Sequence, residues 1–418
     1  MNQQDVFIIG ASIAGCTAAI LFARRGLKVA LIERNPDLEH YKKMCTHFIQ
    51  ASATPTIQRL RLAEKIEAAG GIRNAVNIWT RWGWIVDTLD DGKHPAYGYN
   101  IRRSVLDPML RKLAIETPGV DFMPGVAGDK LLEAGGRFSG VEVIDKNGGK
   151  REMRARLVVA ADGRHSRIAN LSGANTARKA HNRFAYFAHY RGLQLSSGKR
   201  SQMWFLEPDL AYTFPNEDDV TVVACMPSKD KLPAWKNNPE ECFERFVGEL
   251  LDGPRLGEAT RVSQLYGIVD MTNTTRPAAH NGLAFIGDAA MANDPLWGVG
   301  CGWAFQSAEW LVESTADALV QHKNLDSALA RYRKKHKTEL AGHEILISDY
   351  ATARPFNAIE KLMYSAAARD KALAHNFLLF GQRSIGVLQF LSPRAMARSA
   401  WVNMTWKAPA QPSREQAV

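Results

Sequence analysis

A short glycine-rich segment near the start of the chain has the spacing of a phosphate-binding turn. It follows an apolar, strand-like run at 6–9 and opens a helical pattern at 13–26; its residues are Gly10, Ala11, Ser12, Ile13, Ala14 and Gly15. Gly10 permits the tight turn, Gly15 lets the helix pack against the strand, and the helix N-terminus offers N–H groups to a pyrophosphate. Ser12 replaces the second glycine of the fingerprint and still permits close backbone approach.

The residues that follow give this turn the context of a dinucleotide site. Glu33 ends the next apolar run, 28–33, about 20 residues further on, where a carboxylate accepts hydrogen bonds from the adenosine ribose. Arg34 adds positive charge near the adenine or phosphate. The alternative, a purely structural glycine turn, does not require this strand–helix–strand order.

Two further carboxylates follow buried, strand-like runs. Asp162 comes after 157–161, and Asp288 comes after 282–287, directly behind Gly287. A carboxylate at a strand end can bind ribityl hydroxyls, and a glycine-rich turn into a helix presents N–H groups to a flavin ring edge. Such a turn leads into the predicted helix 300–319, and its residues include Pro295, Trp297, Gly298, Val299, Gly300 and Cys301.

Together the three motifs resemble the flavoprotein class that includes p-hydroxybenzoate hydroxylase-type monooxygenases, flavin-dependent halogenases and geranylgeranyl reductases. The resemblance spans 5–319 and implies bound FAD, with Asp288 on the ribityl chain, the 295–302 turn against the isoalloxazine, and Asp162 in a motif shared with nicotinamide handling. It also implies that Arg103, which opens an Arg-x-x-Leu-Asp helix, meets the FAD phosphates, although a surface arginine is the alternative. Gly128 corresponds to a backbone contact with the adenine.

The order of elements predicts an α/β fold in which a Rossmann-type FAD-binding domain is interleaved with a mainly antiparallel substrate sheet. Strand-like runs at 184–193, 202–205 and 220–226 support that second sheet. We expect a helix at 56–69 and a loop at 41–50. The expected divisions are 1–175 and 276–325 for the FAD-binding domain, 176–275 for the substrate sheet, and 326–418 for a helical C-terminal region with breaks at Pro355 and Pro393 and a disordered tail around Pro409 and Pro412.

Composition limits the class of protein. The formal charge is +10, and nine Lys or Arg against three acidic residues lie in 351–418. This basic tail fits either a solvated helical face or a surface for a membrane or an acidic carrier partner; no nucleic-acid module is recognised. The five cysteines have no CxxC spacing, which disfavours zinc, any other metal site and a disulfide framework and fits the cytoplasm.

His47 is the candidate catalytic residue. It lies in the segment from Lys43 through Cys45 to Ile49, which resembles the Lys-x-Cys-Gly-Glu segment of the reductase and halogenase branch, with Thr46 and His47 in place of Gly-Glu. A histidine near the flavin can donate a proton, and a structural, hydrogen-bonded histidine is the alternative.

The resemblance leaves the reaction open. The first hypothesis is hydroxylation of a small apolar or aromatic substrate of secondary metabolism, free or carrier-bound, through a flavin C4a-hydroperoxide formed from O₂. NAD(P)H, or a separate flavin reductase, would supply electrons. The alternatives are a reductase of the geranylgeranyl type, a halogenase and a non-catalytic flavoprotein. The halogenase is disfavoured because its Trp-x-Trp-x-Ile-Pro stretch lies after the Asp162 motif and the similar Trp82–Trp84 segment lies before it, without the proline.

Four aromatic residues are candidates for the substrate site, with core packing as the alternative: Trp82, Trp84, Tyr97 and Trp297. Tyr97 and Tyr99 are, with His47, the candidates for the base that a phenol hydroxylase requires.

Overall fold

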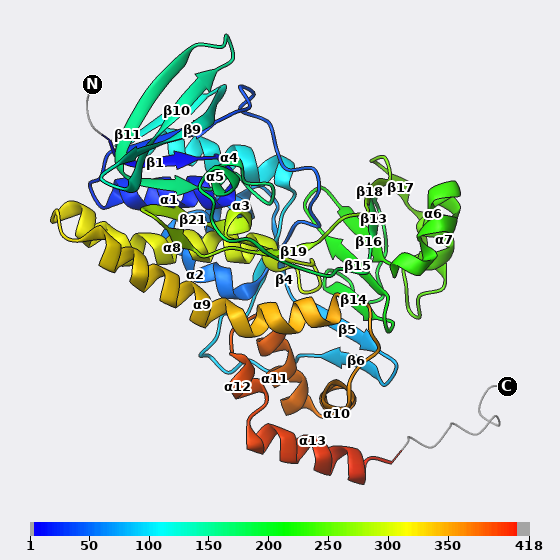
Figure 1. Ribbon diagram of the computed structural model, residues 1–418. Helices are drawn as coiled ribbons and strands as arrows, with labels where there is room; N and C mark the ends of the chain where they lie inside the picture. Colours follow the sequence, from blue (N-terminus) through cyan, green and yellow to red (C-terminus); the bar gives the residue numbers. More distant parts are fainter. Residues whose placement is uncertain (1–3, 408–418) are drawn as a thin grey trace, which may run out of the picture.

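The computed structural model describes residues 4–407, which form two large β-sheets and a C-terminal group of helices (Figure 1). The predicted α/β architecture is confirmed. The expected tail around Pro409 and Pro412 lies outside the described residues.

The first sheet contains a parallel core of five apolar strands. These are β1 (Gln4–Ile9), β2 (Val29–Glu33), β8 (Val120–Pro124), β11 (Lys150–Ala160) and β21 (Leu283–Phe285). They lie in the order β21-β11-β1-β2-β8, with β20 (Ala279–His280) antiparallel at the edge. Because the strands are parallel, the turns that follow β1, β2, β11 and β21 meet at one edge of the sheet.

Helices and a hairpin complete this domain. Helix α1 (Ile13–Arg24) packs against α4 (Arg103–Ile115) and α8 (Val299–Val320), while the short α5 (Arg167–Leu171) packs against β9. Strand β10 (Arg137–Asp145) pairs with the first half of β11, and β9 (Val126–Ala134) pairs with β10; both project at the top of Figure 1.

Two local predictions need correction. The expected helix 56–69 is two helices, α2 (Thr54–Arg59) and α3 (Ala63–Ala68), because Arg61 between them has a left-handed φ of 58°. The expected loop 41–50 ends in a strand, β3 (Phe48–Ile49), which joins β4 (Ile72–Asn74) and β7 (Gly98–Asn100).

The second sheet is mostly antiparallel. Its order is β17-β13-β16-β15-β14-β5-β6, and β18 also pairs with β13. The strands are β5 (Val76–Thr80), β6 (Gly83–Val86), β13 (Ala185–Arg191), β14 (Ser201–Phe205), β15 (Leu210–Pro215), β16 (Val220–Met226), β17 (Thr260–Arg261) and β18 (Tyr266–Ile268). Strands β5 and β6 therefore come from the segment 1–175; the domain division itself stays a prediction.

Smaller elements connect the two sheets. Helices α6 (Leu232–Asn237) and α7 (Pro239–Gly248) lie at the outer side of the second sheet (Figure 1). A three-stranded sheet links the two regions, formed by β12 (Ala177–Lys179), β19 (Asn273–Thr275) and β22 (Met291–Ala292).

The C-terminal region is helical, as predicted. Helix α9 (Leu325–Tyr350) packs along α8. Helices α10 (Ala358–Ala367), α11 (Lys371–Gly381), α12 (Val387–Phe390) and α13 (Pro393–Thr405) form a separate layer at the bottom of Figure 1. The predicted breaks are confirmed, since Pro355 lies between α9 and α10 and Pro393 begins α13.

Candidate dinucleotide site

The turn after β1 is packed so closely that neither Gly10 nor Gly15 could carry a side chain. Gly10 has a φ of 103°, and a Cβ there would lie 2.5 Å from the Ala161 carbonyl oxygen. A Cβ on Gly15 would lie 1.8 Å from the Gly10 carbonyl oxygen. Helix α1 has no side-chain cap on its first turn, so the N–H groups at Ile13 and Ala14 remain for an anionic group.

The Glu33 carboxylate fixes this turn by a hydrogen bond to its backbone. Its carboxylate accepts hydrogen bonds from the Ala11 N–H at 2.9 Å and from the Asn35 N–H at 3.0 Å. Each oxygen keeps a further lone pair for a ribose hydroxyl. Arg34 is exposed beside it.

Arg103 joins helix α4 to the glycine turn. Its guanidinium lies 2.7 Å from a carboxylate oxygen of Asp107, one helical turn away, and donates at 2.7 Å to the Ser12 hydroxyl. Arg111, another turn along, donates to the His40 carbonyl at 2.7 Å. The sequence motif contained Arg103 and Asp107 but gave Asp107 no role, and it missed Arg111, although the i, i+4 spacing of the three on one helix face was a usable signal.

Asp288 lies where the turn after β21 meets the loop after β2. The Lys42 ammonium is 2.8 Å from its carboxylate. Burial raises the pKa of Asp288, but the charge of Lys42 and the hydrogen bond from it lower that pKa below its ordinary value overall. The site therefore holds an ionised carboxylate beside a cation. Lys42 was not found from the sequence, because the contact joins segments 246 residues apart.

Asp162 and Gly128 have structural contacts. The Asp162 carboxylate accepts from the Ser166 hydroxyl at 2.6 Å and from the Ile168 N–H at 3.1 Å, which fixes the start of α5. Burial raises the pKa of Asp162. Gly128 is buried on β9, and a Cβ there would lie 3.1 Å from Ile168 Cδ1. Their roles toward FAD stay predictions.

A buried network of charged side chains holds the glycine-rich turn before α8 in place. The Asp294 carboxylate lies 2.7 Å from His181 Nε2 and 3.0 Å from the Arg183 guanidinium, and all three side chains are fully buried. Burial opposes ionisation of Asp294, but the charge of Arg183 leaves its pKa lowered. Asp294 also accepts from the Leu296 N–H at 2.7 Å. This network was missed because Arg183 has no motif around it.

At the top of the turn the backbone has the left-handed conformation that glycine favours. Gly298 has a φ of 63°, and a Cβ there would lie 2.4 Å from the Phe48 ring. Helix α8 begins at Val299 without a side-chain cap, so its first N–H groups, at Val299, Gly300 and Cys301, can receive an acceptor such as a flavin ring edge.

His47 lies at the site, but both ring nitrogens have protein partners. The Arg103 N–H donates to Nδ1 at 3.1 Å, and Nε2 lies 3.0 Å from His189 Nε2. Nδ1 is thus an acceptor, Nε2–H donates to His189, and His189 Nδ1–H faces the Ser263 hydroxyl at 3.1 Å. Burial lowers the pKa of His189 to about 4. A catalytic role for His47 stays a prediction.

The four candidate substrate aromatics do not meet. Trp297 packs against Phe205 and Phe377, and Trp82 stacks on Phe356 in the same cluster. We call this the aromatic cluster; it contains Trp82, Phe205, Trp297, Tyr350, Phe356, Tyr364, Phe377, Phe380 and Phe390.

Trp84 and Tyr97 lie elsewhere. Trp84 packs edge-to-face on Trp204 and donates to Asp252 at 2.9 Å, in a different hydrophobic cluster. The two tryptophans separate because Trp82 lies in the turn before β6 and Trp84 lies within that strand. Tyr97 packs on Tyr99. Only Trp82 and Trp297 of the four remain candidates for one substrate wall.

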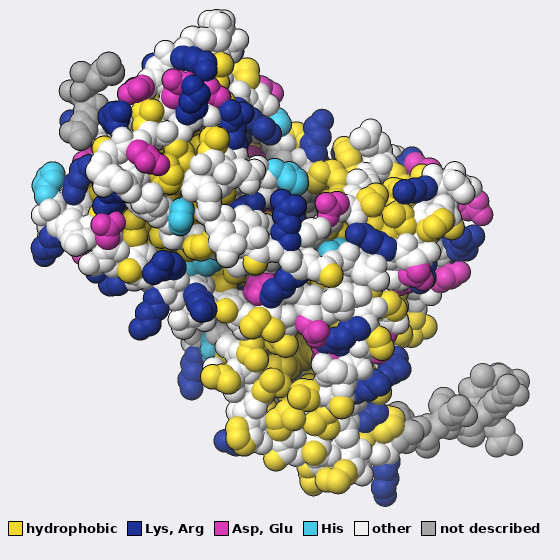
Figure 2. All heavy atoms as spheres, in the orientation of Figure 1, with side chains coloured by type: hydrophobic (Ala, Val, Ile, Leu, Met, Phe, Trp, Pro, Cys, Tyr) yellow, Lys and Arg dark blue, Asp and Glu magenta, His cyan; other side chains and the backbone are white. Residues whose placement is uncertain are grey.

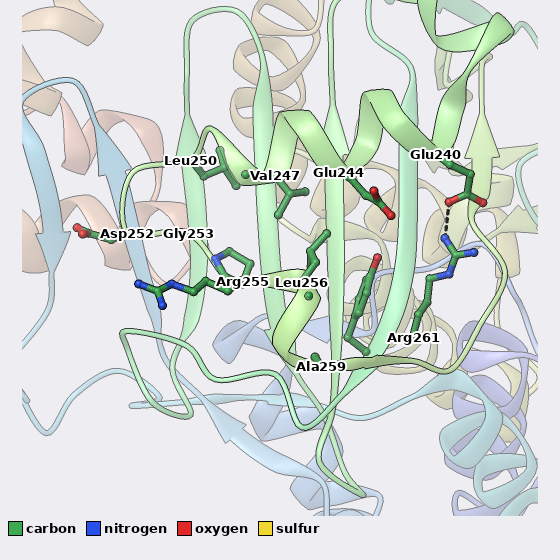
Figure 3. Close-up of a pocket in the computed structure, with 14 residues that line it drawn as sticks. Glu240, Glu244, Val247, Leu250, Asp252, Gly253, Arg255, Leu256, Ala259 and Arg261 are labelled. Atoms are coloured by element: carbon green, nitrogen blue, oxygen red, sulfur yellow. Dashed lines mark hydrogen bonds and ion pairs between the residues drawn. The ribbon is translucent and has the colours of Figure 1, made fainter.

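Two cavities lie away from the motifs. One, of about 910 Å³, opens between α7 and the 250–261 segment, where Figure 3 shows Glu240 paired with Arg261. The other, of about 420 Å³, lies near His280 and Arg333. Neither is lined by a motif residue. Among residues 4–407, no three His, Cys, Asp or Glu side chains form a metal-binding group. In the same part of the chain no helix has the length and hydropathy needed to cross a bilayer.

These features are typical of a dinucleotide-binding protein with two glycine turns, one after β1 and one before α8. The donor set fits FAD, because two uncapped helix N-termini, Arg103 and Lys42 could receive phosphates and Asp288 could accept from ribityl hydroxyls.

Comparison with known proteins agrees. The model of the FAD binding domain family matches residues 3–340, and the chain belongs to this family. The chain is an FAD-dependent oxidoreductase, and NAD(P)H is the reductant typical of the family.

Among curated relatives are two archaeal enzymes. Digeranylgeranylglycerophospholipid reductase 1 of Methanococcoides burtonii is 23% identical and covers 82% of each chain. The Methanopyrus kandleri enzyme of the same name is 26% identical, over 81% of this chain and 87% of its own.

Solved structures share the fold at low identity. A flavoprotein/dehydrogenase from Cytophaga hutchinsonii has a TM-score of 0.81 at 16% identity, covering 96% of this chain and 99% of that one. The flavin-dependent brominase Bmp2 has a TM-score of 0.77 at 19%, covering 96% and 98%. PqsL of Pseudomonas aeruginosa, described as a probable FAD-dependent monooxygenase, has a TM-score of 0.68 at 18%, covering 84% and 99%.

Proposed function

We propose that this chain is an FAD-dependent reductase that saturates carbon–carbon double bonds in the prenyl chain of a lipid. The sequence motifs alone favoured hydroxylation over this alternative. The curated relatives that match over four-fifths of the chain are reductases of prenylated glycerophospholipids, which supports the alternative instead.

The observation that carries the proposal is the aromatic cluster beside the glycine turn. Trp297 of the turn lies 5.3 Å from Phe205 and 5.7 Å from Phe377, ring centroid to centroid. Burial raises the pKa of Tyr350 and of Tyr364 within it, so both phenols stay neutral. A wall of neutral aromatic rings is suited to an apolar chain and excludes water from the flavin side.

Two of the three candidate bases for a phenol hydroxylase, His47 and Tyr99, have partners within the protein. Both ring nitrogens of His47 are hydrogen-bonded within the protein. The Tyr99 hydroxyl donates to Glu67 at 2.7 Å, and burial raises the pKa of Tyr99. Reduction of an isolated alkene requires no such base.

When bound and reduced, FAD would supply a hydride to one alkene carbon, and the neighbouring carbon would take a proton that originates from solvent. The residues of this chain would hold and shield it: Arg103 and Lys42 would neutralise phosphate charge, Asp288 would accept from the ribityl hydroxyls, and Gly298 would leave room beside the start of α8. The aromatic cluster positions the prenyl chain by apolar contact.

A lipid substrate requires access from a lipid surface, and the C-terminal helices offer one. Leu388 is 91% exposed, Trp401 60% and Met404 79%. Ala397, Trp401 and Met404 follow one another at helical spacing along α13. We call Leu388, Ala397, Trp401 and Met404 the apolar C-terminal face; Figure 2 shows hydrophobic side chains gathered at this end of the molecule.

Basic residues adjoin this face. Arg394 and Arg398 lie on α13, and Lys407 follows it. An exposed apolar stripe with cationic neighbours is complementary to an anionic bilayer surface. Phe377 and Phe380 of α11 are buried and pack on the Trp297 ring. The proposed partner is therefore a membrane carrying anionic headgroups.

Product analysis tests the function. Holoenzyme with dithionite and a geranylgeranylated glycerophospholipid in vesicles, without oxygen, is expected to yield lipid heavier by two hydrogens per reduced double bond. The matched reaction uses NAD(P)H, air and a panel of phenols, indoles and quinolones. A product heavier by one oxygen there, with unchanged lipid in the first reaction, would replace the reductase by the monooxygenase.

A further inference from the structure

Two of the five cysteines lie against each other at the FAD site. Cys45 Sγ and Cys301 Sγ are 3.8 Å apart, although 256 residues separate them in the chain. Cys45 belongs to the loop between β2 and β3, and Cys301 lies in the first turn of α8. The remaining three, Cys16, Cys225 and Cys242, are buried in α1, β16 and α7.

The surroundings of the two cysteines favour a thiolate at Cys45 that accepts a hydrogen bond from the protonated thiol of Cys301. The Arg103 guanidinium donates to Cys301 Sγ at 3.9 Å, and the His47 N–H donates to Cys45 Sγ at 3.3 Å. The hydrogen bond from Cys301 holds the pKa of Cys45 well below its usual value, helped by His47 and Arg103. Cys301 keeps its proton, because the hydrogen bond with Cys45 and burial raise its pKa.

The buried cysteines Cys16 and Cys225 differ from Cys45 in the pKa of their thiols. Burial raises the pKa of Cys16 and of Cys225, so these remain protonated. Only the thiolate is a good nucleophile, and a second thiol within reach can resolve a sulfenic acid. Only Cys45, which is partly exposed, combines these conditions with a neighbouring thiol.

We propose that Cys45 and Cys301 form a redox-active dithiol, modified by oxidants of the hydroperoxide class. The Cys45 thiolate attacks one oxygen of hydrogen peroxide; the O–O bond breaks, and the hydroxide that leaves takes a proton to become water. The sulfur of Cys301 then attacks the sulfur of the Cys45 sulfenic acid, and the hydroxyl group leaves with the Cys301 proton as a second water. The two thiols lose two electrons in total, and the peroxide gains them.

The geometry allows this bond with a small movement. A disulfide needs an S–S distance of about 2.05 Å, so the sulfurs must approach by roughly 2 Å. The chain from Asn35 to His47 has no helix or strand, which permits the shift on the Cys45 side. The disulfide would tie the loop that carries Lys42 to the first turn of α8, across the FAD site. The inference rests on the FAD site and not on the proposed substrate.

Mass spectrometry tests the proposal. Thiol-reduced, FAD-loaded full-length protein is treated with hydrogen peroxide, alkylated with N-ethylmaleimide and digested. We expect a linked Cys45–Cys301 peptide that dithiothreitol separates. Cys301→Ser should leave Cys45 as a sulfenic acid that dimedone labels, and Cys45→Ser should leave Cys301 alkylated. Cys242→Ser, the matched control, should still form the link.

The readout separates this proposal from the function. A protein that forms the Cys45–Cys301 link but reduces no lipid would contradict the proposed reductase function and leave the dithiol proposal intact. Full alkylation of Cys45 and Cys301 after peroxide, at a dose that oxidises exposed methionines, would overturn the dithiol, and so would a link between any other pair of cysteines.

Discussion

The Lys42 ammonium lies 2.8 Å from the Asp288 carboxylate, so the loop after β2 and the turn after β21 are joined by an ion pair at the FAD site. We expect Asp288→Ala to remove both the ribityl acceptor and the partner of Lys42. The variant should purify with little flavin, read as the ratio of visible to protein absorbance, and with unchanged far-UV circular dichroism. Full flavin occupancy would contradict the assignment; Asp317→Ala, at an exposed carboxylate, is the control.

The turn before α8 offers a matched pair of glycines. Gly298→Ala places a Cβ 2.4 Å from the Phe48 ring at a φ of 63°, whereas a Cβ on Gly300 meets nothing within 4 Å. We expect Gly298→Ala to weaken FAD binding by at least about tenfold, because strain of 1–3 kcal/mol falls on the turn itself. Gly300→Ala should bind FAD nearly as the parent does. Equal affinities, measured by fluorescence titration, would remove the turn from the site.

Removing one partner of the buried Arg103–Asp107 pair should destabilise the fold more than replacing both partners by apolar residues. Arg103→Met leaves Asp107 charged and unpaired, at a cost of about 3–5 kcal/mol in the free energy of unfolding. Adding Asp107→Leu should recover part of that loss. Urea unfolding of FAD-free protein measures it without the contribution of the cofactor. A double variant less stable than the sum of the singles would argue against the pair as the cause.

These contacts show which parts of the site were predictable. The glycine turn, Glu33, Arg103, Asp288 and the turn before α8 could be proposed from the sequence because each has short-range spacing next to an apolar strand or helix. The Lys42–Asp288 and Asp294–Arg183 pairs were not, because they join segments far apart in the chain and neither Lys42 nor Arg183 has a motif around it.

The errors in the fold have similar causes. The break at Arg61 depends on one left-handed residue inside a helical pattern, which composition does not reveal. Trp82 and Trp84 were grouped by sequence, but Trp82 lies in the turn before β6, whereas Trp84 lies within the strand and packs on Trp204. Whether β5 and β6 extend the second sheet is settled by a parallel pairing with β14, a non-local contact.

Two buried histidines predict a pH dependence of stability. Burial and the positive charge of Arg383 lower the pKa of His336 and of His343 from 6.5 to about 4. Between those values the unfolded chain binds protons that the folded chain does not, so stability falls as the pH falls from 6.5 towards 4. Each group contributes at most about 1.4 kcal/mol per pH unit. The free energy of unfolding, measured with denaturant at several pH values, should change less steeply with pH in His336→Phe than in the parent. An unchanged dependence on pH would show that His336 is not a source of it.

The apolar C-terminal face predicts binding to vesicles. Trp401→Ser combined with Met404→Ser removes two exposed apolar side chains, each worth about 1.5–3 kcal/mol when buried. We expect at least about a tenfold loss of sedimentation with phosphatidylglycerol vesicles and binding that weakens with salt. Leu251→Ser, at an exposed residue of the second domain, is the control. Parent protein that stays in the supernatant would refute the membrane surface.

The most direct test of the reductase is flavin reoxidation without oxygen. Holoenzyme reduced by light and a photosensitiser is mixed anaerobically with vesicles containing a geranylgeranylated glycerophospholipid, and the flavin absorbance is followed. The account predicts that the oxidised spectrum returns with the unsaturated lipid and not with its saturated counterpart. Flavin that stays reduced with both lipids, and is reoxidised only when oxygen and an aromatic substrate are added, would contradict it.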